Sequence, residues 1–247
     1  MNIAGIIPAR YGSTRFPGKP LIDINGKTMI RRVYEQASKA AKLAEVIVAT
    51  DDERIVKEVE SFGGRVVMTA ETHGSGTERC AEVVERLEKS GSNFGAVINI
   101  QGDEPFLDPS QIDLLAEMFK DPQVQIATLI KKIMLPADLE NPNVVKVVTD
   151  ARQRALYFSR SAIPYFRTLP PDQWHKNHQY LGHVGIYAYR TKALKKIVAL
   201  PEGKLEKCES LEQLRWLENG FSIHVQLTDM ESISIDAPGD LSKIINI

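Results

Sequence analysis

The sequence has little cysteine, little net charge and no long apolar run, and each shortage excludes a class of protein. Its two cysteines, Cys80 and Cys208, form no Cys-x-x-Cys or Cys/His spacing, which argues against a disulfide framework or a zinc site. A net charge of −1 gives no general attraction to nucleic acid or to an anionic membrane. No apolar run approaches the roughly 18 residues of a membrane span, and no signal-peptide pattern is present. We therefore expect a cytoplasmic protein with reduced thiols, no nucleic-acid partner and no membrane insertion.

The first half of the 247-residue chain alternates short apolar runs with helical stripes. Strands are expected at residues 3–7, 45–50, 65–68, 96–101 and 125–129. Helices are expected between them: from Met29, over 52–61, after a capping box at Ser75 to Glu78, and after Asp108-Pro109. This β-α-β alternation predicts an α/β fold with a doubly wound, mostly parallel sheet and helices on both faces.

The second half is less regular. Strands at 144–149 and 155–158 are expected to form a hairpin that turns at 150–153, and residues 168–177 are expected to form a loop. A strand at 185–189, helices at 191–198 and 211–217, a strand at 221–227 and a closing helix at 238–245 follow. No linker divides the chain, so residues 1–247 are expected to form a single domain with an irregular arm around 150–190.

The loop after the first strand combines two glycines with three cations, Arg10, Arg15 and Lys19. Open α/β sheets bind ligands at the carboxyl ends of their strands, where small residues let backbone N–H groups approach an anion. The segment is therefore typical of a polyphosphate site, and a nucleoside triphosphate is the expected ligand. A surface loop with solvated charges is the plainer alternative.

This loop is not a Walker A motif. Gly12 and Gly18 are separated by five residues, and Lys19 is followed by Pro20 rather than by a hydroxyl that would bind magnesium. Pro17 and Pro20 also disfavour a helix that starts directly there. The spacing argues against a P-loop kinase or GTPase.

Two aspartates are candidate magnesium ligands. Asp103 follows the strand at 96–101 and a glycine, and Asp236 lies between a short apolar run and Pro238. Either one alone is equally compatible with a turn or a helix N-cap. Beside a polyphosphate loop, a two-aspartate Mg²⁺ site is the better interpretation, because magnesium takes one or two carboxylates together with phosphates and water.

Eight segments in order resemble the 3-deoxy-manno-octulosonate (Kdo) cytidylyltransferases, also called CMP-Kdo synthetases, over essentially the whole chain. They read IPARYGSTRFPGKP at 7–20, VATDD at 48–52, SGTER at 75–79, QGDEP at 101–105, ALYFSR at 155–160, HVGIY at 183–187, LEQLR at 211–215 and DAPGDL at 236–241. The resemblance implies an enzyme that joins CTP to Kdo, giving CMP-Kdo and pyrophosphate for lipopolysaccharide synthesis. It also implies a homodimer built through the second half of the chain.

The resemblance further implies a role for particular residues. The CTP-binding set is Arg10, Ser13, Arg15, Lys19, Ser75, Gly76, Thr77, Arg79 and Gln101. The sugar-binding set is Gln101, Arg160, His183, Glu212 and Gln213. Asp103 and Asp236 would bind Mg²⁺, the expected cofactor, and together with Lys19 they form the expected catalytic set. A surface ion pair at Arg160, a structural His183 and a solvated helix face at Glu212 are the plainer alternatives.

Some positions depart from the family pattern. The closing motif has Ala237 and Gly239 where the family commonly has Thr and Glu, and Tyr165 stands where Trp is frequent. These departures leave open an acceptor carrying an 8-amino group in place of the 8-hydroxyl of Kdo. A metal-dependent glycosyltransferase is a further alternative, although Gln101-Gly102-Asp103 lacks the Asp-x-Asp strand end of that class. A nucleotide-sensing module without turnover is disfavoured by the aspartate pair.

Overall fold

The computed structural model describes residues 1–12, 16–231, 234–235 and 237–243. Its tertiary contacts divide the chain into two compact units. The first consists of Met1–Glu117, Ala188–Val198 and Met230–Ile247, and the second of Met118–Tyr187 and Ala199–Asp229. We describe the units separately, and the expectation of a single domain with an arm around 150–190 stays a prediction.

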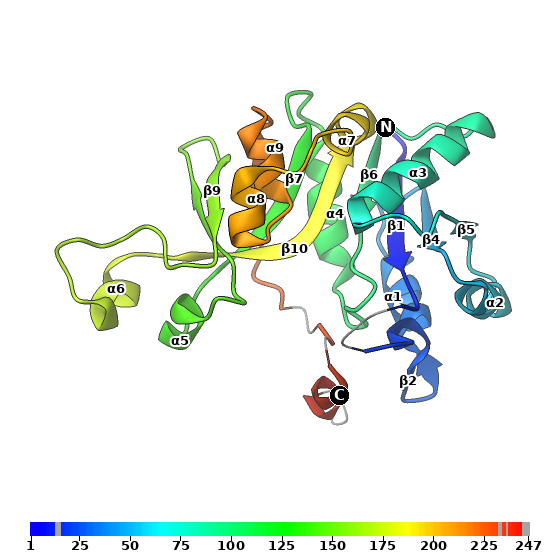
Figure 1. Ribbon diagram of the computed structural model, residues 1–247, viewed down its shortest axis with the longest axis horizontal. Coiled ribbons are helices and arrows are strands. Elements are labelled where there is room, and N and C mark those ends of the chain that lie inside the picture. The colour runs from blue at the N-terminus through cyan, green and yellow to red at the C-terminus, as the bar shows by residue number, and fades with distance from the viewer. Residues whose placement is uncertain (13–15, 232–233, 236, 244–247) are drawn as a thin grey trace. The chain divides into compact units, whose positions relative to one another are not determined.

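A parallel group of strands forms the centre of the first unit, in the order β6-β1-β4-β5 (Figure 1). They are β1 (Ile3–Ala9), β4 (Glu45–Thr50), β5 (Val66–Met68) and β6 (Ala96–Asn99). In register, Ala4 lies opposite Glu45 and Ala9 opposite Thr50, while Ile3 lies opposite Ala96. Because the strands are parallel, the segments that follow them emerge at one edge.

Helices cover the strands of the first unit on both faces, as expected for an apolar parallel sheet. Its helices are α1 (Met29–Ala37), α2 (Glu53–Ser61), α3 (Gly76–Lys89), α4 (Pro109–Met118, whose last residue belongs to the second unit) and α7 (Thr191–Ile197). Helix α1 packs beside α2, and α3 beside α7. The N-caps of α2 and α3 are Asp52 and Ser75, whose side chains accept hydrogen bonds from the first turn of each helix. The sequence predicted the cap at Ser75.

A small apolar cluster joins three segments of the first unit that are far apart in the sequence. Ile24, Met29 and Ile235 form its buried centre, and Phe16 and Phe106 pack against it. The cluster lies beside the short elements η1 (Lys19–Leu21), β2 (Asp23–Ile24), β3 (Lys27–Thr28) and η2 (Pro238–Lys243). It therefore fixes the backbone on both sides of the first loop and of the turn after β6.

The second unit contains the strand order β11-β7-β10, with a hairpin attached. Strand β7 (Ile126–Lys132) is parallel to β11 (Ile223–Leu227), whereas β10 (Leu181–Arg190) pairs antiparallel with β8 (Lys146–Thr149) at Gly182 and Lys146. Strand β9 (Ala155–Ser159) completes the predicted hairpin with β8. The last residues of β10 belong to the first unit. The helices of the second unit are α5 (Pro136–Glu140), α6 (Pro171–Asn177), α8 (Lys204–Glu209) and α9 (Gln213–Glu218).

Two expected elements differ in the structure. The expected loop at 168–177 is wrong in its second part, because Pro171 begins α6 and the buried Trp174 anchors it through an indole N–H bond to the Leu169 carbonyl, 2.8 Å long. The expected closing helix is a 3-10 helix over Pro238–Lys243, and residues 244–245 lie outside the described residues. Among the helices that the structure describes, none is long and apolar enough to cross a membrane.

Candidate active site

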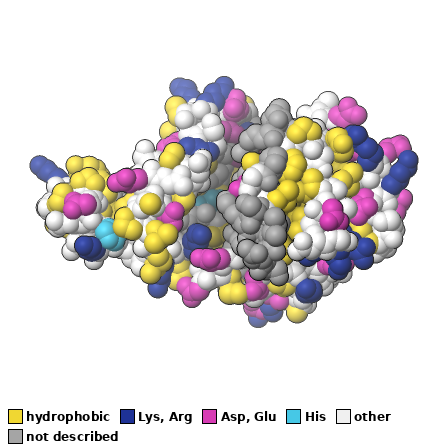
Figure 2. All heavy atoms as spheres, turned by 90° about the horizontal axis from the view of Figure 1, so that it is seen from below, with side chains coloured by type: hydrophobic (Ala, Val, Ile, Leu, Met, Phe, Trp, Pro, Cys, Tyr) yellow, Lys and Arg dark blue, Asp and Glu magenta, His cyan; other side chains and the backbone are white. Residues whose placement is uncertain are grey.

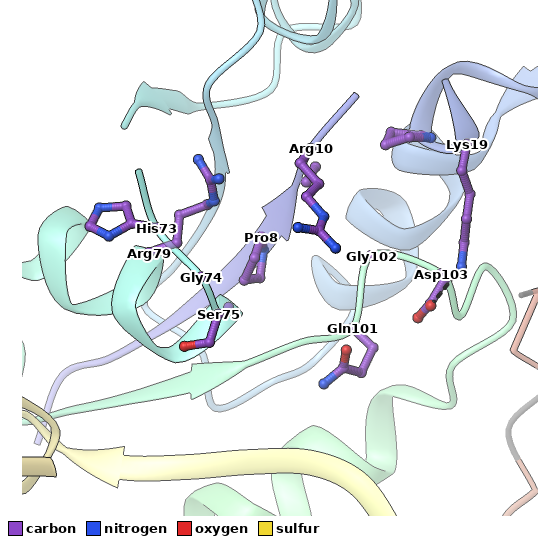
Figure 3. A pocket seen from close by; sticks show the side chains of 13 residues that line it. Pro8, Arg10, Lys19, His73, Gly74, Ser75, Arg79, Gln101, Gly102 and Asp103 are labelled. Carbon is purple, nitrogen blue, oxygen red and sulfur yellow. Dashed lines mark hydrogen bonds and ion pairs between the residues drawn. The ribbon is translucent and has the colours of Figure 1, made fainter. Parts of the chain in front are cut away.

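A cavity of about 280 Å³ lies in the first unit at the carboxyl ends of β1 and β6 (Figure 3). Three segments line it: the first loop, the start of α3 and the turn after β6. The residues of the predicted site among its lining are Arg10, Lys19, Ser75, Gly76, Arg79, Gln101 and Asp103. The structure thus brings together seven of the residues selected from the sequence.

The first loop folds back so that Lys19 faces the turn after β6. Gly18 has a φ of +72°, and an added Cβ there would lie 3.2 Å from the Tyr11 ring, so this position requires glycine. The Gly18 amide donates to the Tyr11 carbonyl over 3.0 Å. Pro17 and Pro20 disfavoured a helix that starts directly here, and the structure has a 3-10 turn over Lys19–Leu21 instead of an α-helix. Lys19 Nζ reaches Asp103 Oδ2 at 2.7 Å.

The N-terminus of α3 supplies backbone donors to the cavity. Ser75 Oγ accepts a hydrogen bond from the Glu78 amide over 3.2 Å, and Ser75 and Gly76 line the cavity. A Cβ on Gly76 would lie 3.3 Å from Pro8 Cγ and 3.4 Å from Asn99 Nδ2, so glycine lets the helix start close to the strand ends. Free N–H groups and the helix dipole at such a start favour an anion or a polar acceptor.

Arg79 is a buried and fixed cation on the first turns of α3. Only 3% of the residue is exposed, yet it lines the cavity. Its Nη2 donates to Asp51 Oδ2 over 2.6 Å, and its Nη1 donates to Thr69 Oγ1 over 2.5 Å. Thr77, in contrast, is 2% exposed and is not among the lining residues.

His73 was not among the residues selected from the sequence, yet it lines the cavity. Its Nε2 lies 2.5 Å from Glu82 Oε2, and the Ala70 amide donates to the same carboxylate over 2.8 Å. Burial raises the pKa of Glu82, but the Ala70 amide, His73 and Arg86 lower it to about 2. The signal in the sequence was the spacing of Glu78 and Glu82 on successive turns of α3, both of which tie the preceding loop to the helix.

The turn that carries Asp103 is tightly placed. A Cβ on Gly102 would lie 2.8 Å from the Pro8 carbonyl oxygen, so the turn passes directly over the end of β1. The Ile235 amide donates to the Asp103 carbonyl over 3.0 Å, which brings the segment before Asp236 to this turn. Asp236 itself, like Ser13 and Arg15, lies outside the described residues. The Asp103 carboxylate contacts the Lys19 ammonium, and a carboxylate oxygen is a ligand type that Mg²⁺ accepts.

Arg160, the first of the predicted sugar-binding residues, belongs to the second unit. Its guanidinium donates to three backbone carbonyls: to Glu209 over 2.6 Å, to Pro142 over 2.9 Å and to Ser210 over 3.3 Å. Its backbone amide also donates to Glu209 Oε2 over 2.9 Å. Three of the five guanidinium N–H groups are thus used for holding the chain around β9. The sugar role of Arg160 stays a prediction.

His183, Glu212 and Gln213 also belong to the second unit. The Nε2 atom of His183 lies 2.9 Å from Thr128 Oγ1, and removal of the ring from water lowers the pKa of His183 to about 3. The imidazole is therefore neutral at physiological pH. Glu212 is the N-cap residue of α9, and Gln213 is buried in its first turn, so this helix begins a few residues later than the sequence indicated.

The chain belongs to the cytidylyltransferase family, whose model matches residues 4–231. Within the family, the 3-deoxy-manno-octulosonate cytidylyltransferase of Bacteroides thetaiotaomicron is 54% identical to it, over 98% of this chain and 96% of the relative. The enzyme of the same name from Thermodesulfovibrio yellowstonii is 50% identical, over 96% of this chain and 94% of the relative.

A solved structure of CMP:2-keto-3-deoxy-manno-octonic acid synthetase complexed with CTP has a TM-score of 0.90 and 45% identity, over 99% of this chain and 97% of that one. A glucose-1-phosphate thymidylyltransferase structure from Bacillus anthracis, described as putative, has a TM-score of 0.65 at 15% identity, over 98% of this chain and 93% of that one, and shares the fold. The predicted α/β fold and the predicted resemblance are both confirmed.

Proposed function

We propose that this chain transfers the cytidylyl group of CTP to Kdo, producing CMP-Kdo and pyrophosphate. The observation that carries the proposal is the cavity of the first unit. It collects three cations (Arg10, Lys19 and Arg79), a helix N-terminus and a carboxylate in a chain that is about half identical to enzymes named for this reaction. The solved neighbour complexed with CTP supports CTP as the donor. The 8-amino acceptor is not favoured, because relatives at this level of identity carry the Kdo name.

Within this proposal, the first loop binds the triphosphate. Arg10 and Lys19 both line the cavity and supply charge, and Ser13 and Arg15 of the same loop complete the proposed set. The protein has a net charge of −1, so this local group of cations would have to attract the anionic nucleotide. A flexible ammonium and a planar guanidinium together suit a phosphate chain, whose oxygens point in several directions.

The start of α3 and Gln101 are proposed to bind the cytidine portion. Arg79 is held by Asp51 and Thr69, so its guanidinium offers donors in a fixed orientation, which suits the acceptor atoms of a pyrimidine ring. Ser75 and Gly76 add the helix N-terminus, and the buried Thr77 would act by supporting that turn. The base would thus be recognised by donors that the fold itself holds in place.

Asp103 and Asp236 are proposed to hold Mg²⁺. Magnesium, when bound, neutralises charge that develops on the phosphate oxygens and aligns the attacking and leaving oxygens. Two observations in the described part of the chain support this. The Asp103 carboxylate pairs with the Lys19 ammonium, and the Ile235 amide donates a hydrogen bond to the Asp103 carbonyl. Asp236 is the next residue after Ile235 in the sequence.

The reaction is an in-line displacement at phosphorus. The anomeric C2 hydroxyl oxygen of Kdo forms a bond to the α-phosphorus of CTP and gives its proton to water. The bond from the α-phosphorus to the oxygen shared with the β-phosphate breaks, and pyrophosphate leaves. Lys19 and Arg10 would hold the departing phosphates as negative charge grows on them. Arg160, His183, Glu212 and Gln213, together with Gln101, are proposed to receive the sugar acid, with Arg160 suited to its carboxylate.

A homodimer is also part of the proposal. The second unit exposes several large hydrophobic side chains, among them Met134, Leu135, Leu156 and Tyr165. Yellow side chains gather over the part of this unit that carries α6 (Figure 2). Such side chains are candidates for an interface. Light scattering should give twice the 27.6 kDa chain mass, and a species of the single mass would remove the dimer. A cytoplasmic location is proposed with it, because the substrate CTP is a cytoplasmic nucleotide.

Magnesium-dependent pyrophosphate release from CTP tests the function, with Kdo and its 8-amino analogue as parallel acceptors. The expected result is release with Kdo and CTP, and none when either is omitted. Release only with the analogue would keep the chemistry and change the acceptor. No pyrophosphate release with either acceptor, or turnover of a sugar nucleotide instead, would overturn the proposal.

A further inference from the structure

Two residues with opposite proposed ligands contact one another in the structure. Lys19 is proposed to bind phosphate anions and Asp103 to bind a divalent cation, yet Lys19 Nζ lies 2.7 Å from Asp103 Oδ2. The side chains are only 13% and 27% exposed, so the pair lies well inside the cavity wall (Figure 3). Water screens the attraction between these two charges less than it screens that of a fully exposed ion pair.

The backbone on both sides of this ion pair is fixed. Lys19 begins the 3-10 turn η1, in which the Leu21 amide donates to the Gly18 carbonyl over 2.8 Å, and the neighbouring Pro20 is buried. Asp103 follows Gly102, which leaves no room for a Cβ next to the Pro8 carbonyl, and its own carbonyl accepts from Ile235. The backbone therefore brings the two residues together, and the contact opens by rotation of side chains, of which that of Lys19 is the longer and more flexible.

An ammonium and a divalent ion compete for the same carboxylate. Mg²⁺ binds oxygen ligands at about 2.0–2.1 Å, so an ion on Asp103 would lie within a few ångströms of the Lys19 nitrogen, and like charges at that separation repel strongly in a partly buried site. A triphosphate offers the Lys19 ammonium another set of oxygens. The nucleotide therefore has the chemistry needed to draw Lys19 away from Asp103.

We propose that Lys19 is the internal counter-ion of Asp103 and keeps the metal position closed until the nucleotide is bound. Free protein then binds a divalent ion weakly, and the ion and the triphosphate favour one another's binding by the same factor. This inference rests on the proposed function, since it takes Asp103 as a metal ligand and Lys19 as a phosphate ligand. It adds a second role for Lys19, in the order of ligand binding.

The test is Mn²⁺ binding to nucleotide-free protein, measured by the loss of the free Mn²⁺ electron paramagnetic resonance signal and by calorimetry. Nucleotide is left out because a triphosphate binds Mn²⁺ by itself. The variant K19Q removes the ammonium, and K19M repeats the test without a hydrogen-bonding end. K19R keeps the charge. K27Q is the matched control, because Lys27 forms a similar pair with Glu35, 2.6 Å long, and does not line the cavity.

K19Q and K19M should bind Mn²⁺ about tenfold more tightly than wild type, within the usual range of coupling between two sites. K19R and K27Q should bind like wild type, and the double variant K19Q/D103N should lose the gain. Unchanged or weaker Mn²⁺ binding in K19Q and K19M would overturn the proposal, and so would a gain that survives D103N. The proposed function fails separately: wild-type protein that forms no CMP-Kdo would refute the activity whatever K19Q does to Mn²⁺ binding.

Discussion

Arg79 and Asp51 form a buried ion pair behind the start of α3, with Nη2 2.6 Å from Oδ2 and side chains 4% and 16% exposed. The helix holds one partner and the end of β4 the other, because Asp51 follows Thr50 directly. Thr69 accepts a further bond from the same guanidinium. The pair therefore connects the strand ends with the helix that lines the cavity.

Replacement of Asp51 by Asn should lower both stability and CTP affinity. The variant D51N leaves a buried guanidinium without its counter-charge, which we expect to cost about 2 kcal/mol of unfolding free energy, less than for a fully buried pair. Because Arg79 loses its fixed orientation, KM for CTP should rise several-fold with Kdo saturating. Urea unfolding and initial rates provide the two measurements.

The matched control is E45Q, which removes the partner of Arg65 in a more exposed pair on the same strand. Exposed pairs contribute little, so this variant should lose less than about 0.5 kcal/mol and keep its KM. Equal losses in D51N and E45Q would show that burial gives the Arg79 pair no special role.

Replacement of Gly102 by Ala should impair catalysis more than folding. An added methyl group would lie 2.8 Å from the Pro8 carbonyl oxygen, so the turn that carries Asp103 must move. A displacement of about 1 Å at a reacting centre costs up to 10²-fold in rate, and we expect kcat/KM to fall at least tenfold. G185A is the control, because no heavy atom lies within 4 Å of its added methyl. Full activity in G102A would show that the turn tolerates the shift.

Replacement of Asp103 by Asn should abolish turnover while the protein stays folded. Loss of one carboxylate charge weakens a metal ligand directly, and we expect kcat to fall by about 10²–10³-fold, as when one electrostatic stabiliser is removed. D236N is expected to do the same. D113N is the control. Asp113 accepts hydrogen bonds from the Ala41 and Lys42 amides and does not line the cavity, so this variant should lower stability and leave turnover unchanged. Near wild-type activity in D103N would refute the metal role.

The sequence predicted the first unit well because local signals and the fold agree there. The apolar run of β1 is buried on both faces, and Ser75 caps α3 at the position that its spacing indicated. The loop cations and Asp103 meet because parallel strands end at one edge, a rule that needs no tertiary information. For these residues, the order of strands and helices along the chain was sufficient to predict that they lie close together.

Contacts between distant segments could not be predicted from local patterns. Helix α6 depends on a tryptophan that is buried only once the fold exists, and three N–H groups of Arg160 are used by carbonyls of Pro142, Glu209 and Ser210. The Asp51 partner of Arg79 and the Lys19 partner of Asp103 likewise join residues from separate segments. A sequence pattern shows which residues suit a ligand. It does not show which of these side chains will form hydrogen bonds or ion pairs with other residues of the protein.

The stability of the protein should fall below pH 6.5 because of His183. In the folded protein its pKa is lowered to about 3 by removal from water, against an ordinary value of 6.5, so between these values only the unfolded chain binds the proton. The stability contributed by the neutral ring is therefore full above pH 6.5 and declines as the pH falls, with a slope of up to about 1.4 kcal/mol per pH unit.

Urea unfolding at pH 7.0, 6.0 and 5.0 tests this prediction. The unfolding free energy should depend less steeply on pH in H183Q than in wild type. In the proton spectrum, the His183 ring signal can be assigned because it disappears in H183Q. In wild type this signal should not titrate between pH 8 and 5. A titration with a midpoint near 6.5 would contradict the half-buried, neutral imidazole hydrogen-bonded to Thr128.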